Sequence, residues 1–275
     1  MGKLNLETTV KLNNGIEIPI LGLGTYLATE DRGYQAIRYA LKIGYRHIDT
    51  AAMYENERKI CLALENDDVP REEIFVTTKL WNSDHGYKKA LEAFEESNEK
   101  LRLDYIDLYL IHWPVQGLRM ESWRALEQLY KDGKCRAIGV SNYTIRYLEE
   151  LLKEAEIVPV VNQVEFHPYL YQKELLEYCM SKNIWIESYS PLTKGRMLED
   201  PPLVEIAKKY RKSTAQILIR WSLQKNTITL PKSANVDRIM ENAEVFEFEI
   251  TEEDMKILDS FNKNLRVTWD PTNAL

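Results

Sequence analysis

Tyr105-Ile106-Asp107-Leu108-Tyr109-Leu110-Ile111-His112 is an almost continuous apolar run, and a second run of this kind, Cys135–Ser141, follows it along the chain. Between the two, Ser122–Lys131 has apolar residues at helical spacing, and Gly133 stands where a glycine often ends a helix. Runs that are apolar along most of their length are typical of strands buried on both faces. Strand, helix and strand in this order predict one unit of a parallel sheet.

The same alternation continues toward both ends of the chain. Helical patterns with one apolar face lie in Tyr87–Leu101, Ile145–Glu154, Lys173–Lys182 and Thr214–Gln224. Eight short apolar runs are predicted strands: Leu21–Gly24, Arg46–Asp49, Ile74–Lys79, Tyr105–His112, Cys135–Ser141, Val158–Val164, Ile184–Tyr189 and Ile228–Leu230. Eight strands, each followed by a helix, predict a closed parallel (β/α)8 TIM barrel, with an open doubly wound sheet as the alternative.

Two further elements flank this repeat. Near the N-terminus, Thr8–Leu12 and Ile16–Ile18 bracket Asn13-Asn14-Gly15, a signal for a β-hairpin that could plug one end of the barrel. Near the C-terminus, Thr251–Asn262 is predicted as an extra helix, and the tail after it has no strong pattern. Because no linker or change of composition interrupts the chain, residues 1–275 are expected to form one barrel domain.

Composition excludes several classes of protein. Of the 275 residues, 44% are hydrophobic and 29% are charged, which suits a soluble domain with a large core. The net charge of −7 makes nucleic acid and anionic membranes poor partners. No apolar run approaches the roughly 18 residues of a membrane span, and the N-terminus lacks the apolar stretch of a signal peptide. We therefore expect a cytoplasmic protein, and a monomer, because no large apolar helix face is left over outside the barrel.

Familiar short motifs are absent or incomplete. Gly22-Leu23-Gly24 lacks the third glycine of a dinucleotide fingerprint, and Ser188-Tyr189-Ser190 lacks the glycines of a nucleophile elbow. The four histidines do not pair at the spacing of metal ligands. The three cysteines are odd in number and form no CxxC, so neither a disulfide framework nor a zinc site is expected; they are Cys61, Cys135 and Cys179.

Four polar residues stand at or just past the ends of three successive predicted strands. Asp49 closes the second strand and Tyr54 lies in the loop after it, while Lys79 closes the third strand and His112 the fourth. In a parallel barrel the carboxyl ends of all strands open onto one face, where function gathers. Taken singly, each has an ordinary explanation: the aspartate as a helix cap, the lysine and tyrosine as surface residues, and the histidine as a hydrogen-bonded core residue.

Together, these side chains suit protonation of a carbonyl oxygen as a hydride arrives. A tyrosine hydroxyl has an ordinary pKa of about 10, and a nearby buried ammonium is expected to lower it. Tyr54 would then be the acid, Lys79 and Asp49 the pair that tunes it, and His112 the donor that orients the carbonyl. No metal is needed for this chemistry.

The residues around these four resemble the aldo-keto reductases. The matching motifs run from about Leu12 to Asp259, in the order and at the spacing that a single barrel requires. They are Gly44–Ala51 with Tyr54, Thr78–Trp81, Ile111–Pro114, Ile138–Asn142, Asn162-Gln163 with His167-Pro168, Tyr189–Leu192, and Leu230–Ser233 with Arg238, Glu241 and Asn242.

The resemblance implies a (β/α)8 barrel that reduces aldehydes and ketones to alcohols with NADPH, and it gives Asp49, Tyr54, Lys79 and His112 the roles described above. It also implies a set of cofactor contacts. Tyr189 would lie under the nicotinamide ring, with Ser141, Asn142 and Gln163 at its amide and Thr25 at its ribose. Ser190 and Leu192 would line the pyrophosphate, and the 2′-phosphate would be held by Lys232, Ser233 and Arg238. Asn242 would contact the adenine, and Asp49 and Glu241 are further cofactor residues.

The residues near the predicted start of a helix after the eighth strand support NADPH over NADH. Lys232 and Arg238 supply two cations and Ser233 a hydroxyl, and helix N-termini favour phosphate. In TIM barrels the phosphate site commonly follows strands seven and eight. Without the family context, a solvated pair of cations on a helix surface remains the alternative.

The expected substrate pocket consists of Tyr26, Trp81 and Trp113 around the acid, with His112 at its base. Aromatic walls with few charges suit small ketoaldehydes and aryl aldehydes, and sugar-derived carbonyls are a further possibility. The chain departs from the common family pattern at Tyr26, where many animal members have Trp, at Glu55, where Gly is common, and at Cys61, which replaces a usual Gly or Ser.

The short loop after His112 and the brief tail are typical of compact microbial members of the family, such as the glyoxal/methylglyoxal and 2,5-diketogluconate reductases. An open pocket predicts broad activity. An NADPH-binding regulatory subunit with little turnover is the alternative. A structural role and a lyase or isomerase are less favoured, because the four residues are intact and no Schiff-base or enolate site is present.

Overall fold

The computed structural model describes residues 4–28 and 30–274 of the chain. One parallel sheet has its strands in the spatial order of the sequence, and each strand pairs with its predecessor. Its strands are β3 (Leu23–Gly24), β4 (His47–Asp49), β5 (Phe75–Leu80), β6 (Ile106–Ile111), β7 (Cys135–Ser141), β8 (Val161–Glu165), β9 (Trp185–Tyr189) and β10 (Ile228–Leu230).

The first and last strands of this sheet meet. The amide of Gly22 donates to the carbonyl oxygen of Thr229 at 3.0 Å, and the amide of Gly24 donates to that of Pro231 at 3.1 Å. Thr229 in turn donates to the carbonyl of Ile20 at 2.8 Å. These bonds curl the sheet into the predicted (β/α)8 barrel, so the open doubly wound alternative is wrong.

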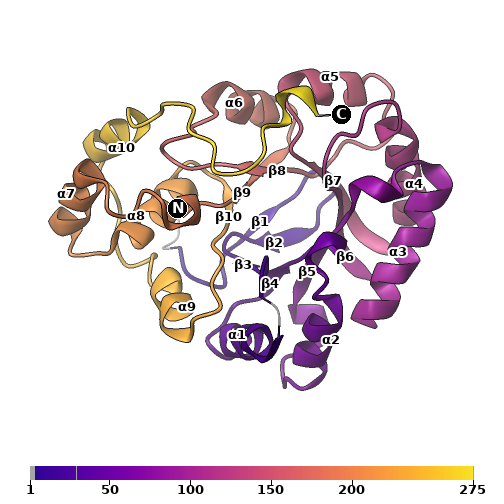
Figure 1. Cartoon of the computed structure of the whole chain (residues 1–275), viewed down its shortest axis with the longest axis horizontal. Coiled ribbons are helices and arrows are strands. Elements are labelled where there is room, and N and C mark those ends of the chain that lie inside the picture. The colour runs from indigo at the N-terminus through magenta and orange to yellow at the C-terminus, as the bar shows by residue number, and fades with distance from the viewer. Residues whose placement is uncertain (1–3, 29, 275) are drawn as a thin grey trace.

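Helices surround the barrel in a ring (Figure 1). Their buried faces pack against the outside of the strands, as the helical spacing of apolar residues predicted. In chain order they are α1 (Glu30–Lys42), α2 (Glu57–Glu65), α3 (Tyr87–Leu101), α4 (Arg119–Lys131), α5 (Ile145–Leu152), α6 (Lys173–Ser181), α7 (Pro201–Tyr210), α8 (Thr214–Gln224), α9 (Val236–Ala243) and α10 (Glu252–Asp259).

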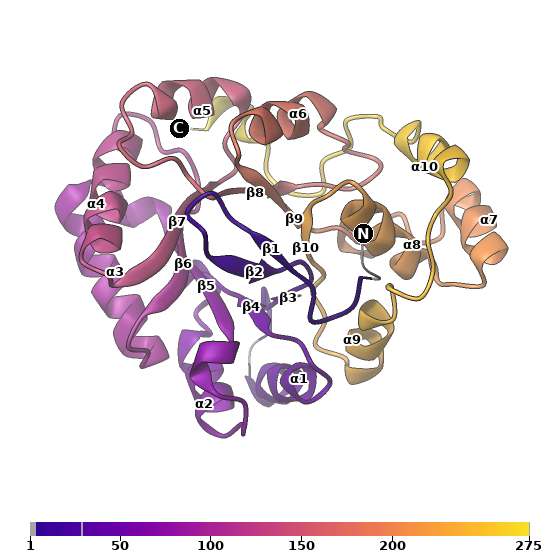
Figure 2. The same cartoon turned by 180° about the vertical axis from the view of Figure 1, so that it is seen from behind.

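The predicted N-terminal hairpin is present and covers the barrel end where the strands begin (Figure 2). It consists of β1 (Thr9–Lys11) and β2 (Glu17–Pro19), with Gly15 at a φ of +89°, a left-handed value that favours glycine. Asn13 fixes the turn by donating its side-chain amide to the carbonyl oxygens of Pro159 and Asn183, each at 3.1 Å. These carbonyls lie just before β8 and near the start of β9, so the hairpin is anchored to strand beginnings.

Apolar side chains fill this closed end of the barrel interior. Leu12 and Ile18 of the hairpin pack there with Phe75 and Leu108 from the strands, and Ile18 is fully buried. Toward the opposite end, the inward side chains of the strands become polar. The packed half therefore supports a polar half whose groups face the carboxyl ends of the strands.

Several predicted boundaries differ from the structure by one to three residues. β8 begins at Val161, not at Val158, because Val158 is exposed and Pro159 has no amide hydrogen for the ladder. The extra C-terminal helix ends at Asp259, and its start is as predicted, with the Thr251 hydroxyl oxygen accepting from the Asp254 amide at 3.2 Å. Among the described residues, no helix has the length and apolar character needed to cross a membrane.

Candidate active site

The four predicted active-site residues lie together at the carboxyl end of the barrel. Asp49 is the last residue of β4, Lys79 lies in β5, and His112 directly follows β6. Tyr54 ends a short 3-10 helix, Ala52–Tyr54, in the loop after β4. The parallel sheet therefore brings side chains from three strands to one place, as predicted.

Asp49 and Lys79 form a buried ion pair. The Lys79 ammonium donates to both carboxylate oxygens of Asp49, each at 2.8 Å, and to the carbonyl oxygen of Thr50 at 2.6 Å. Lys79 is fully buried and Asp49 nearly so. An ammonium has three N–H donors, so all three of Lys79 are used. The pair leaves no ammonium hydrogen for Tyr54 in this state of the protein.

The expectation that Lys79 lowers the pKa of Tyr54 is wrong for this state. The ammonium nitrogen lies 5.2 Å from the centre of the Tyr54 ring, with Asp49 bound to it. Burial, and then the negative charge of Asp49, raise the pKa of Tyr54 well above its ordinary value. Because Asp49 largely cancels the field of Lys79, desolvation dominates, and Tyr54 holds its proton at neutral pH.

His112 is neutral and lies beside Tyr54, with their ring centroids 5.9 Å apart. Burial and the charge of Lys79 lower the pKa of His112 well below its ordinary value. Its backbone carbonyl accepts from the side-chain amide of Asn142 at 3.0 Å, which ties β6 to the end of β7. A neutral imidazole beside a protonated phenol supplies two hydrogen-bond donors from neighbouring rings.

The predicted nicotinamide contacts form a connected group next to the ion pair. Gln163 donates one side-chain N–H to Asp49 Oδ2 at 2.8 Å, and the Ser141 hydroxyl donates to the carbonyl of Gln163 at 2.8 Å. The Tyr189 hydroxyl donates to Asn142 Oδ1 at 2.7 Å. Asn142 has a φ of +63°, a left-handed value that asparagine tolerates better than most residues.

Three other residues predicted to contact the cofactor differ in their exposure to solvent. Thr25 is fully buried, and its hydroxyl donates to the carbonyl of Asp49 at 2.8 Å. Ser190, with a φ of +50°, and Leu192 follow β9 and are half-buried. The loop after β9 is thus accessible, while the Thr25 hydroxyl is committed to the protein.

The predicted phosphate site lies at the start of α9. Lys232 and Arg238 are both exposed, and neither forms an ion pair with any residue in 4–28 or 30–274. Ser233 accepts the amide of Asn235 at 3.1 Å, and Asn235 caps the helix by accepting the amide of Arg238 at 3.0 Å. Farther along this helix, Glu241 is half-buried and Asn242 is buried.

Aromatic rings surround Tyr54 and His112. Tyr26 lies against Tyr54 at 5.1 Å between centroids, and Trp81 against His112 at 5.2 Å. Trp269 lies 5.7 Å from Trp113 and is 64% exposed. Trp269 is not among the predicted site residues, since the tail has no periodic pattern and is placed by contacts with distant strands.

The tail reaches the site through a second buried carboxylate. Glu165, in β8, accepts the backbone amides of Val267 at 2.7 Å and Thr268 at 3.0 Å, and it also accepts a hydrogen bond from the Thr268 hydroxyl. The Thr268 hydroxyl in turn lies 3.1 Å from that of Tyr189. Glu165, the last residue of β8, was also missed, because it lies one residue beyond the predicted strand Val158–Val164.

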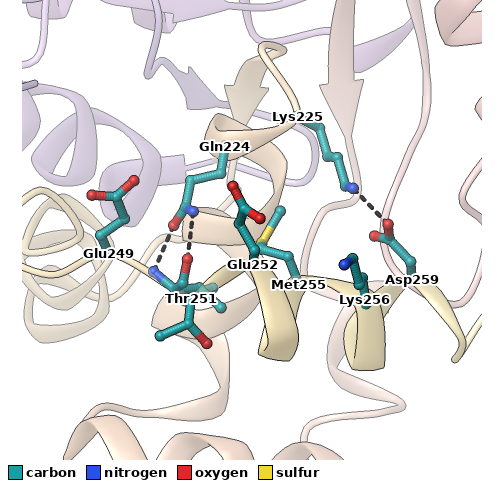
Figure 3. Close-up of a pocket in the computed structure, with 9 residues that line it drawn as sticks. Gln224, Lys225, Glu249, Thr251, Glu252, Met255, Lys256 and Asp259 are labelled. Carbon is teal, nitrogen blue, oxygen red and sulfur yellow. Dashed lines mark hydrogen bonds and ion pairs between the residues drawn. The ribbon is translucent and has the colours of Figure 1, made fainter. Parts of the chain in front are cut away.

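A pocket on the outside of the barrel has a different character (Figure 3). It has a volume of about 590 Å³ and lies between the end of α8 and α10. The Gln224 side chain exchanges two hydrogen bonds with the backbone of Ile250, each at 2.8 Å, and Lys225 pairs with Asp259 at 2.7 Å. Its polar groups serve to join two helices, so the polar cluster at the carboxyl end remains the candidate site.

Comparison with known proteins agrees with this geometry. Residues 21–263 match the model of the aldo/keto reductase family. The glyoxal reductase of Bacillus subtilis is 51% identical over 272 residues, which cover 98% of this chain and 99% of that protein.

Solved structures of aldo-keto reductases superpose along almost the whole chain. An enzyme from a Medee basin deep-sea metagenome library has a TM-score of 0.93 at 46% identity, over 96% of this chain and 98% of that one. A Bombyx mori enzyme in complex with NADP has a TM-score of 0.90 at 38% identity, over 96% of this chain and 95% of that one. The chain therefore belongs to the aldo/keto reductase family, the NADP(H)-dependent oxidoreductases that its motifs resemble.

Proposed function

We propose that this protein reduces aldehydes and ketones to alcohols with NADPH, and that Tyr54 supplies the proton. One observation carries the proposal: Tyr54 and His112 lie together next to the buried Asp49–Lys79 ion pair. At neutral pH Tyr54 keeps its hydroxyl proton and His112 is an uncharged imidazole with one N–H. NADPH, when bound, supplies the hydride. The group that accepts the proton would be the carbonyl oxygen of the substrate.

The side chains divide the work of protonation. Neutral His112 donates a hydrogen bond that orients the carbonyl oxygen toward Tyr54. Tyr54 is fully protonated at neutral pH, since its pKa is raised, and so the acid form is always present. As negative charge develops on the carbonyl oxygen, the proton moves to it from the Tyr54 hydroxyl. The Lys79 ammonium, 5.2 Å from the centre of the Tyr54 ring, then offsets part of the negative charge that Asp49 places near the tyrosinate.

The residues fit NADPH at two separate places. At the nicotinamide end, the Gln163 amide oxygen accepts no hydrogen bond from the described residues and suits a carboxamide N–H. At the phosphate end, Lys232 and Arg238 flank the start of α9 without an acidic partner in the described ranges. Two uncommitted cations at a helix N-terminus suit a 2′-phosphate better than a free hydroxyl.

We assign the remaining contacts by the same likeness to the family. Tyr189 would lie under the nicotinamide, with Ser141 and Asn142 at its amide. The other proposed cofactor residues are Thr25, Asp49, Ser190, Leu192, Ser233, Glu241 and Asn242. The neighbour solved with NADP and the family match support this assignment.

The aromatic walls favour small carbonyl compounds. Tyr26, Trp81, Trp113 and the missed Trp269 offer ring faces and few charges around His112. We infer that glyoxal-type ketoaldehydes and aryl aldehydes are substrates, with sugar-derived carbonyls as a further group. The 51% identity to the Bacillus subtilis glyoxal reductase supports the first of these.

Oxidation of NADPH in the presence of methylglyoxal, phenylglyoxal or 4-nitrobenzaldehyde tests the proposal, with NADH in parallel. We expect turnover with NADPH and weaker turnover with NADH. The double variant Lys232→Ala/Arg238→Ala should lose most of the preference for NADPH. Tight binding of NADPH without turnover of any carbonyl would overturn the proposal in favour of a regulatory subunit.

Three other expectations accompany this function. We infer that residues 1–275 form one domain, which the helices wrapped around a single barrel support. A monomeric state and a cytoplasmic location stay predictions. Size-exclusion chromatography with light scattering tests the first of the two.

A further inference from the structure

A buried carboxyl group lies within the barrel next to the candidate site. Glu187, in the middle of β9, is fully buried. Its Oε2 accepts a hydrogen bond from Gln163 Nε2 at 2.6 Å. Its Oε1 is buried and has no hydrogen-bond partner among the described residues, and the His47 Nε2 atom lies 3.6 Å from it. The proton transfer proposed for Tyr54 does not use Glu187, so this buried carboxyl group needs a separate explanation.

No counter-ion is available for a charged Glu187. The ionisable groups that face it are His47 and Asp49 from β4 and Lys79 from β5, while β8 contributes the neutral Gln163. Lys79 is already paired with Asp49. Burial, and to a smaller extent Lys79, lower the pKa of His47 to about 3, so His47 is neutral. An ionised Glu187 would therefore be an uncompensated buried charge.

Glu187 accordingly holds a proton at neutral pH. Burial and the negative charge of Asp49 raise the pKa of its carboxyl to about 8. Because Oε2 is the atom that accepts from Gln163, the proton belongs on Oε1, the oxygen that otherwise has no partner. A protonated Oε1 faces the His47 ring, which lies against Phe75 with 5.1 Å between ring centroids.

The two carboxyl groups hold the Gln163 amide from both sides. Its Nε2 has two hydrogens, one donated to Asp49 Oδ2 at 2.8 Å and the other to Glu187 Oε2 at 2.6 Å. With both hydrogens used, the nitrogen cannot exchange places with the oxygen without losing two bonds. The amide oxygen is left as the group that a ligand can use.

We propose that Glu187, in its protonated form, is a positioning residue for the cofactor: together with Asp49 it fixes the Gln163 amide so that its oxygen accepts from the nicotinamide carboxamide. This inference rests on the proposed contact between Gln163 and NADPH. Glu187 does not touch the cofactor itself and acts through Gln163.

Titration of the protein with NADPH, followed by protein fluorescence, tests this role in matched variants. Glu187→Leu removes the acceptor for Gln163 Nε2 and should raise the Kd for NADPH about tenfold, the effect of one lost hydrogen bond at a polar contact. Glu187→Gln keeps an acceptor toward Gln163 and a donor toward His47, so it should keep the Kd of the wild type. Thr229→Val is the control, since Thr229 is fully buried in the neighbouring strand and its hydroxyl has no described partner.

Coupling to Gln163 separates positioning from general damage to the barrel. If Glu187 acts through Gln163, the double variant Gln163→Leu/Glu187→Leu should bind NADPH as weakly as Gln163→Leu alone. Effects that add in the double variant, or a wild-type Kd in Glu187→Leu, would overturn the proposal. Failure of the wild-type protein to bind NADPH would instead overturn the proposed function.

A second measurement applies even if Glu187→Leu does not fold. When the pH rises through about 8, Glu187 loses its proton and places a negative charge near the nicotinamide. The oxidised ring is a cation and the reduced ring is neutral, so the ratio of the Kd for NADPH to the Kd for NADP+ should rise several-fold in the wild type. The ratio should stay flat in Glu187→Gln. An equal rise in both proteins would contradict a titrating Glu187.

Discussion

The two ends of the barrel interior are both buried, but they are held together differently. At the end closed by the hairpin, Leu12, Ile18 and Phe75 pack without directional bonds. At the open end, Asp49 and Lys79 form several hydrogen bonds of 2.6–2.8 Å that fix both groups. Truncating a packed apolar side chain lowers the free energy of unfolding in proportion to the cavity it leaves. Removing one member of a buried ion pair instead breaks whole hydrogen bonds and leaves the other charge buried without a partner.

The comparison separates stability from chemistry. Substitutions at the open end should remove activity, and only those that leave a buried charge unpaired should also destabilise the fold. Changes at the closed end should destabilise the fold and leave the chemistry intact. The following variants test this division, from the largest expected effect to the smallest.

Tyr54→Phe should have the largest effect. It removes the proposed proton donor while keeping the ring against Tyr26 and His112. We expect kcat/KM for methylglyoxal to fall about 10²- to 10⁴-fold, the range for loss of a general acid. The Kd for NADPH and the Tm should stay unchanged. If Tyr54→Phe kept most of its activity, His112 would become the acid to test next.

Lys79→Met should affect both activity and stability. It leaves the Asp49 carboxylate buried without its counter-ion, which should lower the free energy of unfolding by about 3–5 kcal/mol. Urea denaturation measures this change. The double variant Asp49→Asn/Lys79→Met is the control, because it removes both charges and should recover part of the stability but none of the activity. A loss as large in the double variant would mean that packing, not charge, is responsible.

Ile18→Ala should affect stability alone. Ile18 is fully buried in the closed end, and its truncation should lower the free energy of unfolding by about 2–5 kcal/mol. At a temperature where the variant is folded, kcat should match the wild type, and steady-state kinetics beside a urea titration checks both values. A fall in kcat without a fall in stability would show that the hairpin influences the open end.

Glu55→Gly should have the smallest effect. Glu55 is exposed and has a φ of +56°, so its backbone adopts a left-handed conformation that suits glycine. The substitution should raise the free energy of unfolding by at most about 1 kcal/mol, because glycine removes the strain but gains freedom in the unfolded chain. Glu55→Ala, which removes the carboxylate but keeps Cβ, should not stabilise. Equal gains in both would implicate charge instead of backbone strain.

The same division explains what the sequence could predict. The apolar runs of β5, β6 and β7 identify strands directly, and Lys79 and His112 follow from their places at strand ends. The raised pKa of Tyr54 could not be predicted, since it depends first on how deeply the folded barrel buries the hydroxyl and then on the nearby charge of Asp49. Both depend on backbone geometry and not on a pattern of residue types.

Glu187 and Trp269 are both absent from the predicted site, but only Glu187 could have been found from the sequence. Glu187 lies two residues before Tyr189 in β9, and residues two apart in a strand share a face. Both side chains are therefore expected on the inward face, where the carboxyl of Glu187 could have been found. Trp269 could not, because its position depends on contacts between the tail and β8, about a hundred residues earlier in the chain.

The anchoring of the tail has a consequence for how this protein can diversify. Glu165 holds the backbone of Val267 and Thr268, and the ring of the next residue, Trp269, already lies against Trp113. Trp269 therefore directly follows this anchor, and a second anchor lies beyond it, where the Tyr147 hydroxyl donates to the carbonyl of Thr272 at 3.2 Å. A new tail joined after Thr268 would inherit its anchor and leave the proton donor and its ion pair untouched. The segment from Trp269 onward can therefore be replaced, in evolution or by design, without changing the residues that hold Thr268.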